Sequence, residues 1–164
     1  VIRYTLPETL HCWVVDRQPE TLNRAFAMGF QVAFTTGMAE KSLAAYPEFG
    51  ERVAQLAELR LKCSEYLIQC GFDDRIDRSV SNLHAYLYHS QAGLAVTIAD
   101  CEGDGGSIEI TLDPEVYHRI PDGPTTLHHQ DGTTEEVAST TRTKIELKPF
   151  EAAVLALPCK PPEE

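Results

Sequence analysis

The sequence predicts an α+β protein in two parts. Residues 1–71 form a helix-bearing stretch, residues 72–158 an antiparallel β-domain, and residues 159–164 a polar tail. Three observations predict this division: a strand–helix–strand pattern near the start, a long stretch with apolar residues every three or four positions, and then alternation of apolar and polar residues. The first two patterns are typical of helices beside parallel strands, and the third is typical of antiparallel sheets.

The first pattern begins with a short apolar run of strand character over residues 11–16. Pro19 opens a helix that runs to Met28, and Gly29 follows at the position where a C-terminal glycine is expected. A second apolar run covers residues 30–34. Because a strand, a helix and a strand follow one another so closely, we expect the two strands to lie parallel.

Residues 46–71 carry the strongest helical pattern, with Pro47 at the first helical position and Gly71 as the expected end. Apolar residues recur there at steps of three and four, which predicts one long helix with a single buried stripe. The predicted stripe consists of Phe49, Val53, Leu56, Ala57, Arg60, Cys63 and Leu67.

The β-domain follows a charged connector over residues 72–78. Asp131 and Gly132 form the dipeptide preferred in tight hairpin turns. Short strands separated by turn residues are typical of a β-sandwich. We expect strands at residues 83–89, 94–98, 107–112, 125–130, 133–140, 144–147 and 153–157.

Charge and hydropathy exclude several partners. The net charge of -11 argues against nucleic acid, whose binding needs clustered Lys and Arg, and against anionic membrane surfaces. No apolar run approaches the roughly 20 residues that span a bilayer, and no basic-then-apolar leader opens the chain. Because Val1 and not Met comes first, we expect a processed or truncated product.

Neither cofactor nor metal is expected. The acidic run over residues 100–105 alternates like a calcium loop, but Thr111 stands where a bidentate Glu is required, so a polar hairpin turn is predicted. His128 and His129 are adjacent on a strand and point to opposite faces, so they do not chelate together. There is also no glycine-rich phosphate loop and no nucleophile elbow.

The cysteines are scattered, odd in number and without a C-x-x-C pair, so neither a disulfide framework nor a zinc site is indicated. Free, mostly buried thiols are expected, which favours a reducing, cytoplasmic compartment. The five are Cys12, Cys63, Cys70, Cys101 and Cys159.

Asp16 and Arg17 come directly after the first strand, at the edge where α/β folds bind ligands. The competing interpretation is a plain turn that caps the following helix. The residues alone leave both interpretations open.

Four segments carry a family resemblance: residues 24–31 (RAFAMGFQ), 46–49 (YPEF), 56–60 (LAELR) and 145–157 (IELKPFEAAVLAL). Together they resemble the C-terminal end of retaining glycoside hydrolases of the α-galactosidase-like clan, where the last units of a (β/α)8 barrel precede an antiparallel β-sandwich. The resemblance covers nearly the whole chain in architecture, although no single motif in it is diagnostic.

The resemblance implies that residues 11–16 and 31–34 are the last two strands of a TIM-type barrel that is incomplete here. The nucleophile and the acid/base lie on earlier strands in this clan, so this chain would lack both. Asp16, Thr35 and Thr36 would then border the sugar pocket. The implied function is a non-catalytic C-terminal part of a carbohydrate-active enzyme, with carbohydrate as the partner of the whole protein and with the N-terminal barrel residues packed against this chain.

The alternative is a free-standing carbohydrate- or protein-binding β-module with a helical preface. The two readings differ in their surfaces. A barrel fragment leaves a large apolar face open around its strands, whereas a binding module closes that face and exposes aromatic rings for stacking. Of the tyrosines on expected strands, Tyr86 and Tyr88 share a face and are the candidates for such stacking.

Overall fold

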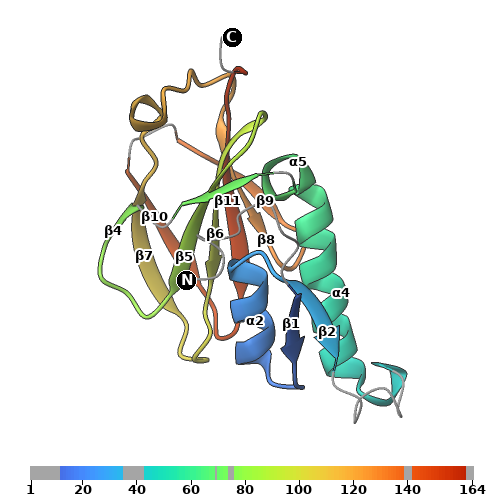
Figure 1. The fold of residues 1–164 in the computed structure, drawn as a ribbon. Coiled ribbons are helices and arrows are strands. Elements are labelled where there is room, and N and C mark those ends of the chain that lie inside the picture. The colour runs from blue at the N-terminus through green and yellow to red at the C-terminus, as the bar shows by residue number, and fades with distance from the viewer. Residues whose placement is uncertain (1–11, 35–42, 69, 74–75, 139–141, 162–164) are drawn as a thin grey trace.

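A computed structural model describes residues 12–34, 43–68, 70–73, 76–138 and 142–161 of the chain. Within these residues the protein is α+β, with three α-helices and mostly antiparallel strands, which confirms the predicted class. A three-stranded sheet, a six-stranded sheet and a helical layer with a two-stranded parallel sheet follow one another across the molecule (Figure 1).

The helical layer begins with β1 (Cys12–Val15), α2 (Pro19–Ala27) and β2 (Gln31–Phe34). The two strands pair in parallel, as predicted, with Cys12 opposite Gln31 and Val15 opposite Phe34. Gly29 has a φ of 68°, a left-handed conformation that favours glycine directly after a helix. This local geometry lets the chain reverse and bring β2 beside β1.

The single helix predicted for residues 46–71 is wrong in its length. After a 3₁₀ turn, η1 (Leu43–Ala45), the chain forms α4 (Pro47–Lys62) and the short α5 (Ser64–Leu67), with the break at Cys63. The buried residues are Phe49, Leu56, Leu59, Cys63 and Tyr66. The break at Cys63 turns the last helical residues so that Tyr66 also faces the six-stranded sheet.

The six-stranded sheet contains β3 (Gly71–Asp73), β5 (His84–His89), β6 (Gly93–Ala99), β11 (Ala152–Pro158), β8 (Thr125–His129) and β9 (Thr134–Val137), in that spatial order. The three-stranded sheet contains β10 (Arg142–Leu147), β7 (Gly106–Thr111) and β4 (Asp77–Arg78). All seven predicted strands are present, and every pair in these two sheets is antiparallel. The short β3 and β4, and the 3₁₀ turn η2 (Pro114–Tyr117), were not predicted.

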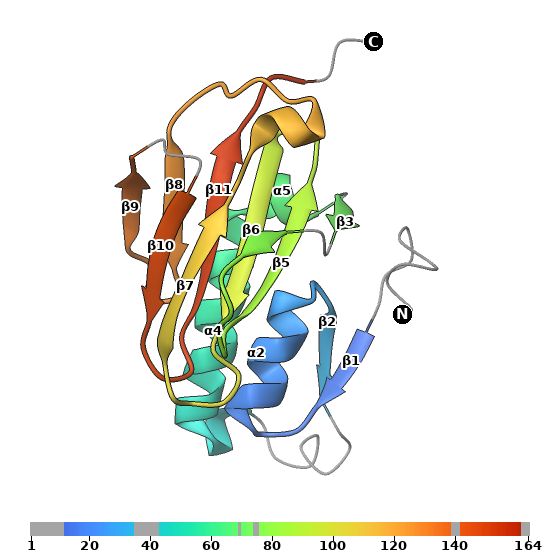
Figure 2. The same ribbon diagram turned by 90° about the vertical axis from the view of Figure 1, so that its left-hand side faces the viewer.

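The central strands of the six-stranded sheet, β6 and β11, are buried on both faces, between the smaller sheet and the helices (Figure 2). On one face, large side chains such as Val96 and Leu155 pack against Ile108 and Ile145 of the smaller sheet. On the other face β6 and β11 present small side chains to α2 and α4. These are Ala95, Ala99, Ala152 and Ala156. Small residues allow the helices to approach the sheet closely.

Buried hydrogen bonds fix α2 on this sheet. The Tyr88 hydroxyl and the Thr97 hydroxyl each donate to the Ala27 carbonyl at 2.7 Å. The Asn23 amide donates to the carbonyls of Asp100, at 2.7 Å, and Phe150, at 2.9 Å. Because these bonds satisfy polar groups inside an apolar interface, they set the position of α2 on the sheet.

Candidate functional site

Asp16 lies at the carboxyl end of β1 and is exposed. Its Oδ1 accepts hydrogen bonds from the Thr21 hydroxyl at 2.6 Å and from the Gln18 backbone N–H at 3.3 Å. The bond from Thr21 holds the pKa of the Asp16 carboxyl below its ordinary value, so the group is ionised at neutral pH. Gln18 caps α2 without a side-chain bond, and Asp16 links the turn before the helix to Thr21 in its first turn.

Two further residues join Asp16 at this edge. The guanidinium of Arg17 lies over the Tyr46 ring, 4.3 Å from its centroid. Phe34, the last residue of β2, packs edge-on against Phe49 at the start of α4, with ring centroids 6.1 Å apart. We call Asp16, Arg17 and Tyr46 the carboxyl-edge cluster. Thr35 and Thr36, the other predicted site residues, lie outside the described residues.

The carboxyl-edge cluster combines three chemistries that suit a polyhydroxylated ring. The carboxylate accepts from hydroxyl groups, with Oδ1 of Asp16 already bonded to Gln18 and Thr21, and the Arg17 guanidinium donates to oxygens. Arg17 covers one face of the Tyr46 ring, so only the other face can stack on C–H groups. Sequence reasoning did not place Tyr46 here, because its contact with Arg17 joins distant parts of the chain. Its position just before the helix that follows the second strand was the available signal, since such residues fall at the carboxyl edge of a βα unit.

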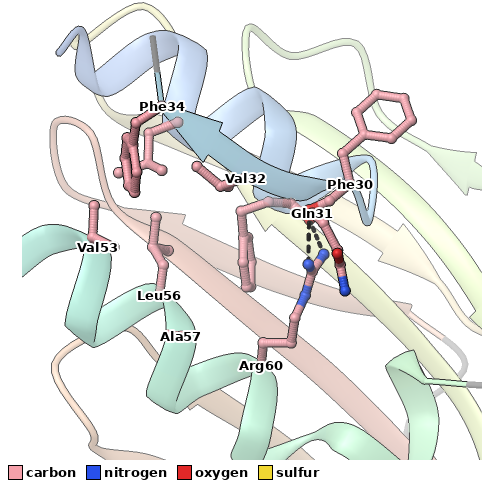
Figure 3. Close-up of a pocket in the computed structure, with 10 residues that line it drawn as sticks. Phe30, Gln31, Val32, Phe34, Val53, Leu56, Ala57 and Arg60 are labelled. Atoms are coloured by element: carbon pink, nitrogen blue, oxygen red, sulfur yellow. Dashed lines mark hydrogen bonds between the residues drawn. The ribbon is translucent and has the colours of Figure 1, made fainter. Parts of the chain in front are cut away.

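A cavity of about 300 Å³ lies between β2 and α4 (Figure 3). Its lining is mainly apolar, with Gln31 and Arg60 as the polar members. The Arg60 guanidinium donates to the carbonyls of Phe30, at 2.8 Å, and Phe26, at 3.3 Å, so backbone groups hold it in place. The remaining lining residues are Leu22, Phe26, Phe30, Val32, Phe34, Val53, Leu56 and Ala57.

His128 and His129 are adjacent on β8, and their side chains have separate surroundings, as their adjacency predicts. Nδ1 of His129 lies 3.0 Å from a Glu151 oxygen, whereas Nδ1 of His128 lies 3.2 Å from the Thr134 hydroxyl. The two rings therefore have different partners. Among the described residues, no group of three or more His, Cys, Asp or Glu side chains is arranged to hold a metal ion.

The acidic loop after β6 is a structural turn, but the predicted hairpin is wrong: β6 and β7 do not pair, and the loop carries the chain from the six-stranded sheet to the three-stranded sheet. Asp100 is fully buried, and its carboxylate accepts from the backbone N–H groups of Glu102, Gly103, Gly105 and Phe150. Burial alone raises the pKa of this carboxyl, but the four donors outweigh it and hold the pKa below the ordinary value. All of these donors belong to the backbone, so the carboxylate is used in tying the loop to the turn before β11.

The tyrosine face of β5 is packed, not open for stacking. Tyr88 is fully buried, and Tyr86 is partly buried. Phe72 lies against both rings, with centroids 5.5 Å from Tyr86 and 5.4 Å from Tyr88. The two-tyrosine face therefore belongs to the core.

Comparison with known proteins adds no relative: no family model, no curated protein and no solved structure matches the chain. In the part of the chain that the structure describes, no helix is both long enough and apolar enough to cross a membrane. Function is therefore inferred from the carboxyl-edge cluster, the cavity and the surface of the parallel strands.

Proposed function

We propose that this chain is the non-catalytic C-terminal part of a carbohydrate-active enzyme of the glycoside hydrolase type. In this proposal β1, α2, β2 and α4 are the last two units of a (β/α)8 barrel, and the antiparallel sheets are its accessory sandwich. The observation that carries the proposal is that, within the described residues, one face of the β1–β2 sheet is exposed.

Alternate residues of these strands point to opposite faces. Trp13, Val15, Val32 and Phe34 pack with the helices. The intervening residues form the other face, where Val14 is 57% exposed and Cys12 and Gln31 are also exposed. Parallel sheets almost always have both faces packed against other parts of the protein. In a (β/α)8 barrel the helices pack on one face, and the other face packs in the barrel interior. The exposed Val14 supports a barrel fragment, although this face is small and includes the polar Gln31.

The carboxyl-edge cluster supports the carbohydrate part of the proposal. Barrel enzymes bind their substrates at the carboxyl ends of the strands, and Asp16, Arg17 and Tyr46 lie at that end. In the whole enzyme these residues border the sugar pocket and orient the substrate. The nucleophile and the acid/base come from other strands, and no residue of this chain takes either role.

The alternative, a free-standing carbohydrate- or protein-binding module, fits the same observations less well. Such a module requires a closed β1–β2 face and exposed aromatic rings on the sandwich. Val14 is exposed, whereas Tyr88 is buried. Both observations favour the barrel fragment.

Thiol labelling of Cys12 tests the proposal, because Cys12 lies on the open face. Burial raises the pKa of Cys63 and of Cys101 to about 11, so both stay protonated and react slowly near pH 8. We expect rapid labelling of Cys12 in the 164-residue chain and protection in the full-length enzyme. Cys12→Ser is the control that identifies the rapid site. Equal labelling of Cys12 in both proteins would contradict the barrel arrangement.

A further inference from the structure

The guanidinium of Arg17 donates to no protein acceptor in the part of the chain that the structure describes, and its contact is with the Tyr46 ring, 4.3 Å from the ring centroid. The other described arginines are used differently. Arg24 lies at the Cys101 thiol, and the rest donate to backbone carbonyl or carboxylate oxygens. Those that donate are Arg52, Arg60, Arg78, Arg119 and Arg142. Arg17 is therefore an exposed cation whose N–H groups remain available for a ligand.

Tyr46 holds the guanidinium of Arg17 in place. The Tyr46 backbone N–H donates to the Leu43 carbonyl at 2.9 Å, and its carbonyl accepts from the Gly50 N–H at 2.8 Å, so the start of α4 fixes its backbone. Its ring packs against the core of the helical layer. The N–H groups of a guanidinium lie in its plane, so a ring over one face takes none of them. A guanidinium held in this way loses less conformational freedom when a ligand binds.

The neighbouring carboxylate does not pair with Arg17. Oδ1 of Asp16 accepts from the Thr21 hydroxyl and the Gln18 N–H instead. Within the described ranges, no ion pair joins Asp16 and Arg17. The net charge of -11 makes the chain as a whole repel anions at long range. An anion therefore binds at this edge only through direct contact with the guanidinium.

The chemistry of a guanidinium selects among possible ligands. Its planar fork of N–H donors matches a carboxylate or a phosphate, whose oxygens accept two parallel hydrogen bonds. A neutral sugar offers single hydroxyl groups and leaves the positive charge without a counter-ion, whereas a cation is repelled. The free donors of Arg17 therefore point to a ligand that carries an anionic group.

We propose that Arg17 selects sugars that carry a carboxylate or a phosphate, through two parallel hydrogen bonds from its guanidinium, and that Tyr46 is the residue that positions it. This inference rests on the proposed function, in which the carboxyl-edge cluster borders the sugar pocket, and it adds the substrate class. Oδ2 of Asp16, which neither Thr21 nor Gln18 bonds, accepts from a hydroxyl group of the same sugar.

Titration of the 164-residue chain with small acidic sugars tests the proposal. The probes are D-glucuronate and D-glucose 6-phosphate, with D-glucose as the neutral control, all at constant ionic strength. Proton–nitrogen correlation NMR follows the backbone N–H signals of Arg17 and Gln18. We expect saturable shifts with a Kd on the order of 10 mM for at least one acid, because a single side chain supplies the anion contact, and none with glucose. The acid that binds more tightly identifies the anionic group as carboxylate or phosphate.

Two matched pairs of variants make the result specific. Arg17→Gln should weaken binding by roughly tenfold or more, which corresponds to about 1.4 kcal/mol. Arg142→Gln should leave binding unchanged, because Arg142 is also exposed but already bonds the Glu109 carboxylate. Tyr46→Phe keeps the ring and should bind like the native chain, whereas Tyr46→Leu removes the ring and should bind more weakly. In Tyr46→Leu the Arg17 Nε–H signal should also lose its ring-current shift while distant backbone signals stay in place, which separates loss of positioning from unfolding.

The proposal is overturned if neither acid gives saturable shifts up to about 100 mM, if glucose shifts the same signals equally, or if Arg17→Gln and Arg142→Gln behave alike. The positioning role is overturned if Tyr46→Leu binds as tightly as Tyr46→Phe. Failure of this selection is distinguishable from failure of the proposed function. Binding of an acidic sugar without protection of Cys12 in the full-length enzyme removes only the barrel proposal, and protection of Cys12 without such binding removes only the selection by Arg17.

Discussion

Asn23 and Asp100 are joined by a buried hydrogen bond of 2.7 Å, from the side-chain amide on α2 to the backbone carbonyl at the end of β6. The same amide nitrogen donates to the Phe150 carbonyl before β11. Arg52 of α4 also donates to the Phe150 carbonyl. Two helices and two central strands of the large sheet therefore meet at a small set of polar contacts inside an apolar interface.

Replacement of Asn23 by Leu should destabilise the chain by about 2–4 kcal/mol, because two buried carbonyls lose a donor. Urea unfolding followed by Trp13 fluorescence measures this loss. Asn82→Leu is the control, since Asn82 is exposed and donates only to the Gly105 carbonyl. A smaller change of about 1 kcal/mol is expected there. Equal losses of unfolding free energy in the two variants would contradict a larger contribution from the buried hydrogen bonds of Asn23.

Asp100→Asn should lower the free energy of unfolding at pH 7 by about 2–3 kcal/mol, because a carboxylate that accepts four backbone donors is replaced by a neutral amide. The folded pKa of Asp100 is lowered, so its stabilisation is present above the unfolded pKa of about 3.9 and is lost as pH falls through the folded pKa.

Unfolding of both proteins in urea at pH 7 and near pH 2 checks this relation. The difference between them should shrink at the lower pH. Asp104→Asn, at an exposed position of the same loop, is the control and should change little at either pH. A difference for Asp100→Asn that stays constant with pH would contradict the role of its ionised form.

Tyr88→Phe and Thr97→Val should show coupled effects, because both hydroxyls donate to the one carbonyl of Ala27. Each single variant leaves that carbonyl one donor, so a loss of about 1 kcal/mol is expected for each. The double variant leaves the buried carbonyl without either bond and should lose more than the sum of the two. A double-mutant cycle from urea unfolding measures the difference, and strict additivity would contradict the shared acceptor.

The proposed function predicts that Asp16→Ala in the whole enzyme raises KM for the sugar roughly tenfold, as for loss of one hydrogen bond to a charged group, with kcat nearly unchanged. Asp131→Ala is a matched control: its Oδ1 also accepts from a threonine hydroxyl, that of Thr133 at 2.6 Å, but it lies in the β8–β9 turn. Steady-state kinetics of both variants measure KM and kcat, and KM should change for Asp16→Ala alone. Unchanged KM for Asp16→Ala removes this residue from the sugar pocket.

The elements that the sequence predicts correctly are marked by residues that lie close together in the chain. Parallel pairing of β1 and β2 follows from the short strand–helix–strand pattern, and Gly29 marks the end of α2. The seven predicted strands alternate or run apolar for long enough to be recognised. These patterns arise within a few residues, and each element keeps its type when the whole chain packs.

The unpredicted features depend on contacts between distant residues. β3 and β4 are three and two residues long and exist because β5 and β7 pair with them. The break at Cys63 accompanies the burial of Cys63 and Tyr66 against the sheet, a contact between residues far apart in the chain. At the candidate site, Asp16 was found because it ends a strand, whereas Tyr46 became visible only through its stacking with Arg17.

The alanine-rich face of β6 and β11 has a consequence for how the chain can be dissected. Ala95, Ala99, Ala152 and Ala156 pack under α2 and α4, and the opposite face of the same strands belongs to the core between the two antiparallel sheets. Excision of the sandwich at Gly71 would expose this face to water and promote aggregation. The helical layer and the two antiparallel sheets should therefore be expressed together, and gene fusions should carry both.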